Sequence, residues 1–286
     1  MNPLDLTPPT EKVALVIGAG TPLGQAIALG LACAGWDVAL HDDQTSQAVP
    51  ELASSIQHLG QRAALLSANL NDERQTTLLI ADCAQKLGLP TCLVYQATYH
   101  QNGETTFNYA LLDAHVRMNS SVPILLAHTL HQAKLATNRS NTDRSVVIPI
   151  FKKSRNDCPS RHDTLSSLSS TLSQAPLQAA IPLLARTLAA TLRVVGIAIE
   201  EQNSSCVSMM TPRAHLDDIT PQINSAHAKS ASSAVQDIAN AVCFLATAQA
   251  ITGTILLADH GHHLLVADHV SCAHTSAADS RPFTNS

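Results

Sequence analysis

A glycine-rich segment near the amino terminus carries the residue types that bind a diphosphate. Gly18, Gly20 and Gly24 lie in VIGAGTPLG (16–24), where an apolar run ends and small residues with helical spacing begin. Small residues between a strand and a helix let a phosphate approach backbone N–H groups at the positive end of the helix. We therefore expect a dinucleotide to bind around these glycines and Leu23. The alternative is a tight turn that needs glycine only for its backbone angles.

Two carboxylates, Asp42 and Asp43, follow the next apolar run. A carboxylate at the end of a second strand can accept hydrogen bonds from ribose hydroxyls and would repel a 2′-phosphate. Neither Thr21 nor Pro22 supplies a positive charge. The sequence therefore favours NAD over NADP, with Asp42 on the ribose, unless the two acids simply lie in a solvated loop.

Fourteen histidines raise the question of a metal site. They are densest at H-x-H-H (260–263), which His269 and His274 follow. Zinc needs three or four converging ligands, whereas this segment overlaps a strand end and a polar tail. We expect no metal site; one of these histidines acting in catalysis is a separate possibility.

The segments that would position these groups alternate between apolar runs and helical patterns. Strands are predicted at 13–17, 37–40, 63–67, 91–95, 144–151, 193–199 and 254–258, and helices at 23–34, 51–59, 72–87, 111–136, 177–192 and 234–247. Parallel strands need crossover helices, so this order predicts an α/β fold with a Rossmann-type doubly wound parallel sheet. Residues 152–173 are interpreted as a loop that grades into a helix. Pro176 fits a first helical turn, but Pro182 should kink that helix or delay its start.

One domain is expected over residues 11–265, with an amino-terminal extension at 1–10 and a disordered polar tail at 266–286. The formal charge of −5 and the absence of a block of like charge argue against nucleic-acid or membrane partners. The seven scattered cysteines fit reduced thiols in the cytoplasm. No segment of the sequence predicts a membrane span.

Several segments together resemble the short-chain dehydrogenase/reductase family over about residues 11–265. The loop IGAGTPLG (17–24) matches the first and last glycines of the family's T-G-x-x-x-G-x-G, with Pro22 at the middle one. Further similar segments are DVALH (37–41), MNSSVPILLA (118–127), TLSQAPL (171–177), RTLA (186–189) and ITGTILLADHGHHL (251–264). Pteridine reductases also replace the middle glycine, and the final H-L is similar to their ending. The resemblance implies the strand order 3-2-1-4-5-6-7, NAD(P)-dependent oxidoreduction and assembly into dimers or tetramers.

Other family positions are altered. The block Y-Q-A-T (95–98) stands where the family has N-N-A-[GS] and keeps only Ala97 in the cofactor pocket. Asn69 replaces an acidic residue near the adenine, and Ile199-Glu200 replaces the P-G pair at the nicotinamide end. Asn119 matches the helix asparagine that supports the family's proton relay, although an isolated helix asparagine also serves capping or packing.

The proton-transfer pair of the family is missing. Reduction of a carbonyl needs a proton donor at the oxygen, and the family uses a tyrosine with a lysine four residues later. No Y-x-x-x-K occurs here. One alignment places Ser170 and Gln174 at these positions, and another places Gln174 and Gln178 there. The third catalytic position falls near Phe151, although Asp157 or Ser160 in the following loop could substitute after a rearrangement.

These departures predict a catalytically inactive family member that acts as a binding or assembly subunit. It would form a homo-oligomer, or a hetero-oligomer with an active paralogue, and NAD would be its dinucleotide if one binds. The alternative is a divergent NAD(P)-dependent oxidoreductase acting on a pterin or another small carbonyl compound.

Overall fold

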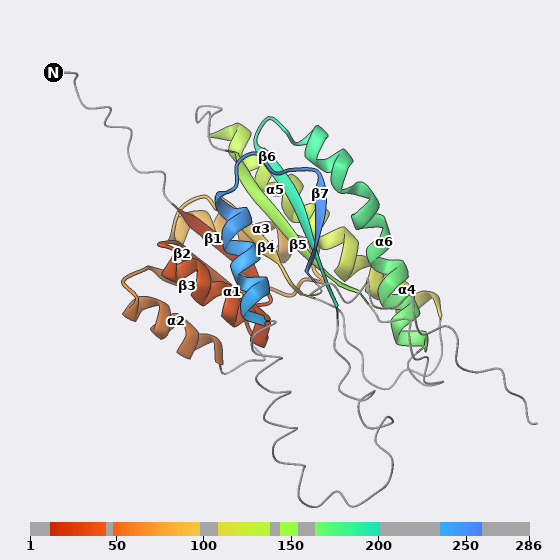
Figure 1. Ribbon diagram of the computed structural model, residues 1–286, viewed down its shortest axis with the longest axis horizontal. Coiled ribbons are helices and arrows are strands. Elements are labelled where there is room, and N and C mark those ends of the chain that lie inside the picture. The colour runs from red at the N-terminus through yellow and green to blue at the C-terminus, as the bar shows by residue number, and fades with distance from the viewer. Residues whose placement is uncertain are drawn as a thin grey trace, which may run out of the picture.

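A computed structural model describes residues 12–43, 48–97, 108–137, 144–153, 164–200 and 235–258. Its centre is a seven-stranded sheet in the order β3-β2-β1-β4-β5-β6-β7 (Figure 1). Each neighbouring pair of strands is parallel. The predicted Rossmann-type fold and strand order are therefore confirmed.

The strands lie close to the predicted apolar runs. They are β1 (Val13–Ile17), β2 (Asp37–Asp42), β3 (Ala63–Ser67), β4 (Cys92–Tyr95), β5 (Ser145–Lys153), β6 (Leu192–Glu200) and β7 (Thr254–Ala258). All residues of β1 and β4 are buried. Continuous burial is expected of a parallel sheet whose two faces are both covered by helices.

The helices are α1 (Pro22–Cys33), α2 (Ala48–His58), α3 (Glu73–Lys86), α4 (Tyr109–Val116), α5 (Val122–Ala136) and α6 (Thr164–Thr187). Residues 235–247 form one more helix. Between α4 and α5 lies η1 (Arg117–Ser121), a π-helical turn. The single helix predicted over 111–136 is thus a helical run interrupted by an extra residue, a feature that hydrophobic periodicity does not report. No described helix has the length and apolar character needed to cross a membrane.

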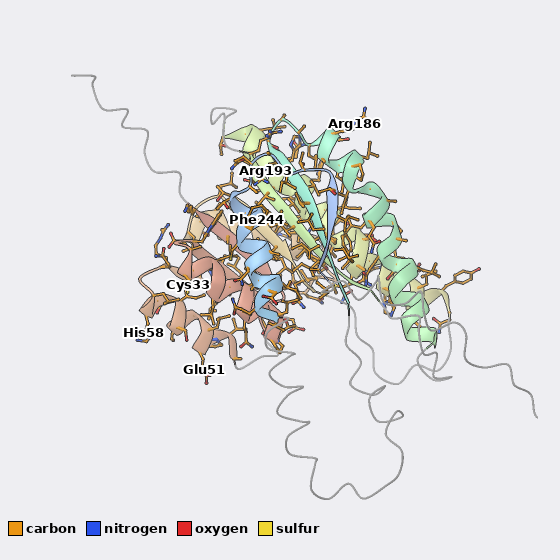
Figure 2. All side chains as sticks on the ribbon, viewed as in Figure 1. Cys33, Glu51, His58, Arg186, Arg193 and Phe244 are labelled. Carbon is orange, nitrogen blue, oxygen red and sulfur yellow. The ribbon has the colours of Figure 1, made fainter. Side chains whose placement is uncertain are left out.

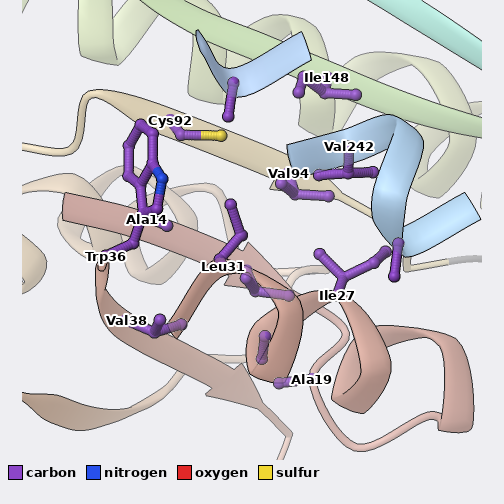
Figure 3. Packing of buried hydrophobic residues seen from close by; sticks show 14 of the residues in the cluster. Ala14, Ala19, Ile27, Leu31, Trp36, Val38, Cys92, Val94, Ile148 and Val242 are labelled. Carbon is purple, nitrogen blue, oxygen red and sulfur yellow. The ribbon is translucent and has the colours of Figure 1, made fainter. Parts of the chain in front are cut away.

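Two apolar layers sandwich the sheet. One joins the sheet to α1, α2 and the 235–247 helix, and the other joins it to α3, α5 and α6. In the first layer, Ile27 and Leu31 of α1 and Val242 of the 235–247 helix point toward Val94 and Ile148 of the sheet (Figure 3). This packing fixes the carboxyl ends of β1, β2, β4 and β5, where candidate site residues lie.

Two predictions about α6 were wrong. The helix begins at Thr164 rather than near 177, and Pro176 lies inside it rather than in its first turn. Of the two effects expected of Pro182, a delayed helix start does not occur, and a kink stays a prediction. Both prolines are exposed, while Leu177 and Ile181 are buried. The apolar face therefore continues across both prolines, and its packing outweighs their low helix propensity. The predicted loop is also shorter, because β5 continues to Lys153.

Arg193 of β6 is a fully buried cation that fastens the 235–247 helix to the sheet (Figure 2). Its guanidinium donates hydrogen bonds to the carbonyl oxygens of Ala248 at 2.7 Å, Ile251 at 3.2 Å and Leu245 at 3.3 Å. These carbonyls lie at or just beyond the carboxyl end of the helix, where its dipole favours a cation. Burial lowers the pKa of Arg193 from its ordinary value.

Candidate functional site

Two glycines of the loop between β1 and α1 are required by its geometry. Gly18 has a φ of +86°, and a Cβ there would lie 3.0 Å from Gln96 Oε1 and 3.1 Å from the backbone nitrogen of Ala97. A Cβ on Gly24 would lie 2.2 Å from the carbonyl oxygen of Gly18. The backbone of the loop therefore packs directly against the first turn of α1. This packing explains why glycine is needed at positions 18 and 24 whether or not a diphosphate binds.

Few N–H groups remain for a ligand in the first turn of α1. Pro22 has no N–H, and the Gly24 N–H donates to Thr21 Oγ1 at 3.0 Å, so that Thr21 caps the helix. The backbone nitrogen of Gln25 donates to the carbonyl of Thr21 at 2.9 Å. Within the described residues, Leu23 supplies the one N–H of this turn without a hydrogen-bond acceptor. The carbonyl oxygen of Gly20 accepts a hydrogen bond from Gln25 Nε2 at 3.1 Å.

A side-chain contact joins this loop to the end of β4. The Thr21 hydroxyl donates to Gln96 Oε1 at 2.6 Å, and Gln96 is buried. The Gln96 backbone N–H donates to the carbonyl of Ile17 at 3.1 Å, at the end of β1. Gln96 thus lies against Gly18 and holds the loop to the sheet. The sequence marked Gln96 only as a departure from the family's asparagine.

The predicted adenosine-binding residues lie along one edge of the sheet. Asp42 ends β2 in register with Ser67 of β3 and is partly exposed. Asn69 follows β3 and is exposed, and its Oδ1 accepts a hydrogen bond from the backbone of Asn71 at 3.0 Å. His41 precedes Asp42 and is buried; burial lowers its pKa, and its Nε2 lies 3.0 Å from the carbonyl oxygen of Ala68. The Asp42 carboxylate therefore lies at the edge of the sheet, while the Asn69 side chain supports a local turn.

The structure brings four predicted site residues around one small cavity at the carboxyl ends of β4 and β5. These residues are Ala97, Asn119, Phe151 and Gln174, and the remaining lining residues are Tyr95, Pro149, Ile150 and Leu177. The cavity measures about 10 Å³, which is close to the lower limit for one water molecule. The described side chains therefore leave little room between β4, β5, η1 and α6.

Tyr95 is a member of this site that the sequence analysis missed. Its hydroxyl donates to the carbonyl of Met118 in η1 at 2.5 Å. Burial raises the pKa of the Tyr95 phenol well above its ordinary value, which is the opposite of the change that assists a catalytic tyrosine. Tyr95 was visible as a replacement in the Y-Q-A-T block, and the burial of every β4 residue explains why its ring lies inside.

Asn119 makes a structural contact within the same region. Its Nδ2 donates to Ser173 Oγ at 2.8 Å, and Ser120 Oγ donates to the carbonyl of Ser173 at 2.5 Å. These bonds tie η1 to α6 beside Gln174, which is also buried. Asn119 and Gln174 therefore lie side by side around this cavity, and the Asn119 Nδ2 contact links η1 to α6.

Several other candidates cannot be placed in this site. The side chains of Ser170, Lys152 and Glu200 lie outside the described part, as do Asp157, Ser160 and the histidines at 260–263. Gln178, the alternative partner on α6, is partly buried. In the described ranges, no three His, Cys, Asp or Glu side chains are arranged to hold a metal ion.

Comparison with known families gives a match over the first half of the chain. Residues 12–140 match the short chain dehydrogenase family. An uncharacterized oxidoreductase of Mycobacterium tuberculosis is 30% identical over 138 residues, which cover 44% of this chain and 51% of the relative. A short-chain dehydrogenase/reductase of Armillaria gallica is 37% identical over 78 residues, covering 27% of this chain and 30% of the relative. The matched segments thus span about half of these curated relatives or less.

Solved structures match over most of the chain. A hydroxysteroid dehydrogenase from Escherichia coli superimposes with a TM-score of 0.66 at 23% identity, covering 87% of this chain and 96% of that protein. FolM alternative dihydrofolate reductase 1 from Brucella suis, in complex with NADP, has a TM-score of 0.66 at 24% identity and covers 88% and 95%. These similarities show the fold. The family match itself extends over residues 12–140.

Proposed function

We propose that this protein is a catalytically inactive member of the short-chain dehydrogenase/reductase family that acts as a binding or assembly subunit. The observation that carries the proposal is the side-chain lining between β4, β5, η1 and α6, where Phe151 and Gln174 lie and no tyrosine–lysine pair four residues apart occurs in the sequence. Reduction of a carbonyl needs a group that gives a proton to its oxygen. Phe151 and Gln174 cannot do so, and the Tyr95 phenol is buried and already donates to Met118.

The residues at the diphosphate end are compatible with a dinucleotide. At the diphosphate end, Gly18 and Gly24 keep side chains out of the loop, and the Leu23 N–H is available. Asp42 supplies a carboxylate for ribose hydroxyls, which favours NAD over NADP. At the nicotinamide end, Phe151 and Gln174 supply no group that could transfer a proton to a substrate.

The choice of NAD is tested by the dissociation constants of NADH and NADPH, measured by calorimetry for the wild type and Asp42→Ala. We expect NADH to bind the wild type more tightly by about 1–3 kcal/mol, and the difference to shrink in the variant. Asn71→Ala, at an exposed neighbouring loop, is the matched control. Tighter NADPH binding by the wild type would reject the assignment to Asp42. Binding of neither would mean that the glycine loop serves only as a turn.

An apolar stripe on the outer side of α6 supports the assembly role. Leu172, Pro176, Ala179 and Leu183 are all exposed and recur at helical spacing, with Leu183 64% exposed. Exposed apolar side chains that share a helix face are typical of interaction surfaces. We propose that this face contacts a second copy or an active paralogue, in the cytoplasm and without nucleic acid or membrane.

Sedimentation of the wild type and Leu183→Glu tests the homo-oligomer. We expect the wild type to be a dimer or larger and the variant to dissociate, while Leu78→Glu, an exposed leucine on α3, leaves the mass unchanged. A monomeric wild type would exclude the homo-oligomer and leave the hetero-oligomer as the proposed assembly. Mixing the protein with a purified active family member should then give a heavier sedimenting species.

A divergent NAD(P)-dependent oxidoreductase is the second candidate. It is favoured by Gly18 and Gly24 of the glycine loop and by the fold similarity to FolM alternative dihydrofolate reductase 1. A pterin or another small carbonyl compound is therefore the first substrate to test. The restored variant Ser170→Tyr with Gln174→Lys separates the two candidates. We expect it to remain inactive because Phe151 and the Y-Q-A-T block are unchanged. Substantial dihydropterin or ketone reduction by this variant would show that the rest of the site is functional.

A further inference from the structure

Away from the candidate site, two thiols line a groove between α1 and the 235–247 helix. Cys33 is in the last turn of α1 and is exposed, whereas Cys243 belongs to the other helix and is partly buried. Both line the groove together with Gln25, Leu29, Gln236 and Asn240. The groove therefore presents one accessible and one sheltered sulfur from segments far apart in the sequence.

The two helices approach closely beside these thiols. A Cβ on Gly30 would lie 3.2 Å from Cys243 Sγ, so the missing side chain of Gly30 makes room for that sulfur. Cys33 follows Gly30 by three residues, and residues at this spacing are neighbours on one helix face, with Cβ atoms about 5–6 Å apart. Cys33 therefore lies on the same face of α1 as Gly30 and lines the groove together with Cys243.

The environments of the two thiols differ in a way that assigns them separate roles. Burial, and then the proximity of Cys33, raise the pKa of Cys243. A raised pKa leaves less thiolate, the form that attacks a disulfide. Cys33 is exposed and so reaches an oxidant first. Behind them, the fully buried Cys92 of β4 has its pKa raised to about 12 by burial and by Cys243.

We propose that Cys33 and Cys243 form a reversible disulfide in response to a low-molecular-weight disulfide such as oxidised glutathione. The Cys33 thiolate attacks one sulfur of the oxidant, whose S–S bond breaks and releases one glutathione thiolate. The Cys243 thiolate then attacks Cys33 Sγ and expels the second glutathione. Two protein thiols lose two protons and two electrons, and the oxidant gains them as two thiols. The product links α1 to the 235–247 helix.

The test exposes the full chain to oxidised glutathione, quenches with acid and maps the alkylated and linked peptides by mass spectrometry. We expect a Cys33–Cys243 peptide and a mass loss of about 2 Da in the wild type. We also expect the bridged protein to melt about 5 °C or more above the reduced form, because the bridge closes a long loop. Dithiothreitol should reverse both changes.

Three single variants distinguish the steps. Cys243→Ala should stop at a stable glutathione adduct on Cys33, and Cys33→Ala should form neither adduct nor bridge in this groove. Cys83→Ala, at a buried thiol in the opposite apolar layer, should still form the Cys33–Cys243 bridge. A persistent adduct on wild-type Cys33, a bridge from Cys243 to a different cysteine, or no reaction at either thiol would each overturn the proposal.

Discussion

Replacing Gly24 by alanine should destabilise the protein through backbone contact alone. The added Cβ would lie 2.2 Å from the carbonyl oxygen of Gly18 and 3.0 Å from the Cα of Ala19. Carbon atoms normally pack at about 3.5–4.0 Å, so the loop or α1 must move by about 1 Å. Overpacking typically costs about 1–3 kcal/mol, and we expect the upper end because both contacts are with backbone atoms.

Gly35→Ala is the matched control because it adds the same methyl group. Gly35 has a φ of +83° with no atom within 4 Å of the added Cβ, so only backbone strain of about 1–2 kcal/mol is expected. The free energy of unfolding, measured by urea titration and circular dichroism, should fall by about 1–2 kcal/mol more in Gly24→Ala than in Gly35→Ala. Equal losses in the two variants would refute the argument that close approach fixes Gly24.

Three further predictions concern buried polar groups. Arg193→Met should lower the free energy of unfolding by about 2–4 kcal/mol, because the carbonyls of Ala248 and Ile251 lose a charged donor; unchanged urea stability would contradict this role. Tyr95→Phe should lower the free energy of unfolding by about 1–3 kcal/mol because the hydrogen bond to Met118 is lost. An unchanged free energy of unfolding in the same urea titration would show that this bond contributes nothing. Burial depresses the folded-state pKa of His41 below 6.5, so protonation favours the unfolded state. The free energy of unfolding should be intact above about pH 6.5 and decline as the pH falls toward 5. His41→Gln should make this decline less steep. An equally steep decline in the variant would mean that groups other than His41 cause it.

The order of the strands could be predicted because each strand is a short apolar run between helical patterns. The ends of α6 could not, since its Ser- and Thr-rich start resembles a loop and its two prolines argue against a helix. Only the tertiary packing of Leu177 and Ile181 on the sheet reveals that the helix continues through them.

The candidate site divides in the same way. Gly18, Gly24 and Asp42 are recognisable because their chemistry depends on position next to a strand end. Tyr95 and Gln96 are not, because their roles depend on which side chains face η1 and the glycine loop. In the sequence, Arg193 is an ordinary charged residue at the start of a predicted strand. No neighbouring residue indicates that its guanidinium caps the end of the 235–247 helix.

Whether the loss of the proton-transfer pair abolishes hydride transfer is tested most directly by a single-turnover experiment with the protein in large excess over NADH. Dihydropterin, quinonoid dihydropterin and a simple ketone are each added at saturating concentration, and the loss of NADH absorbance is followed against buffer. The same mixture with NADPH completes the measurement. We expect rates equal to buffer with each substrate, since no described residue of the cavity can deliver a proton. A rate above about 0.1 s⁻¹, still below typical enzyme turnover, would contradict the proposal that this family member is inactive.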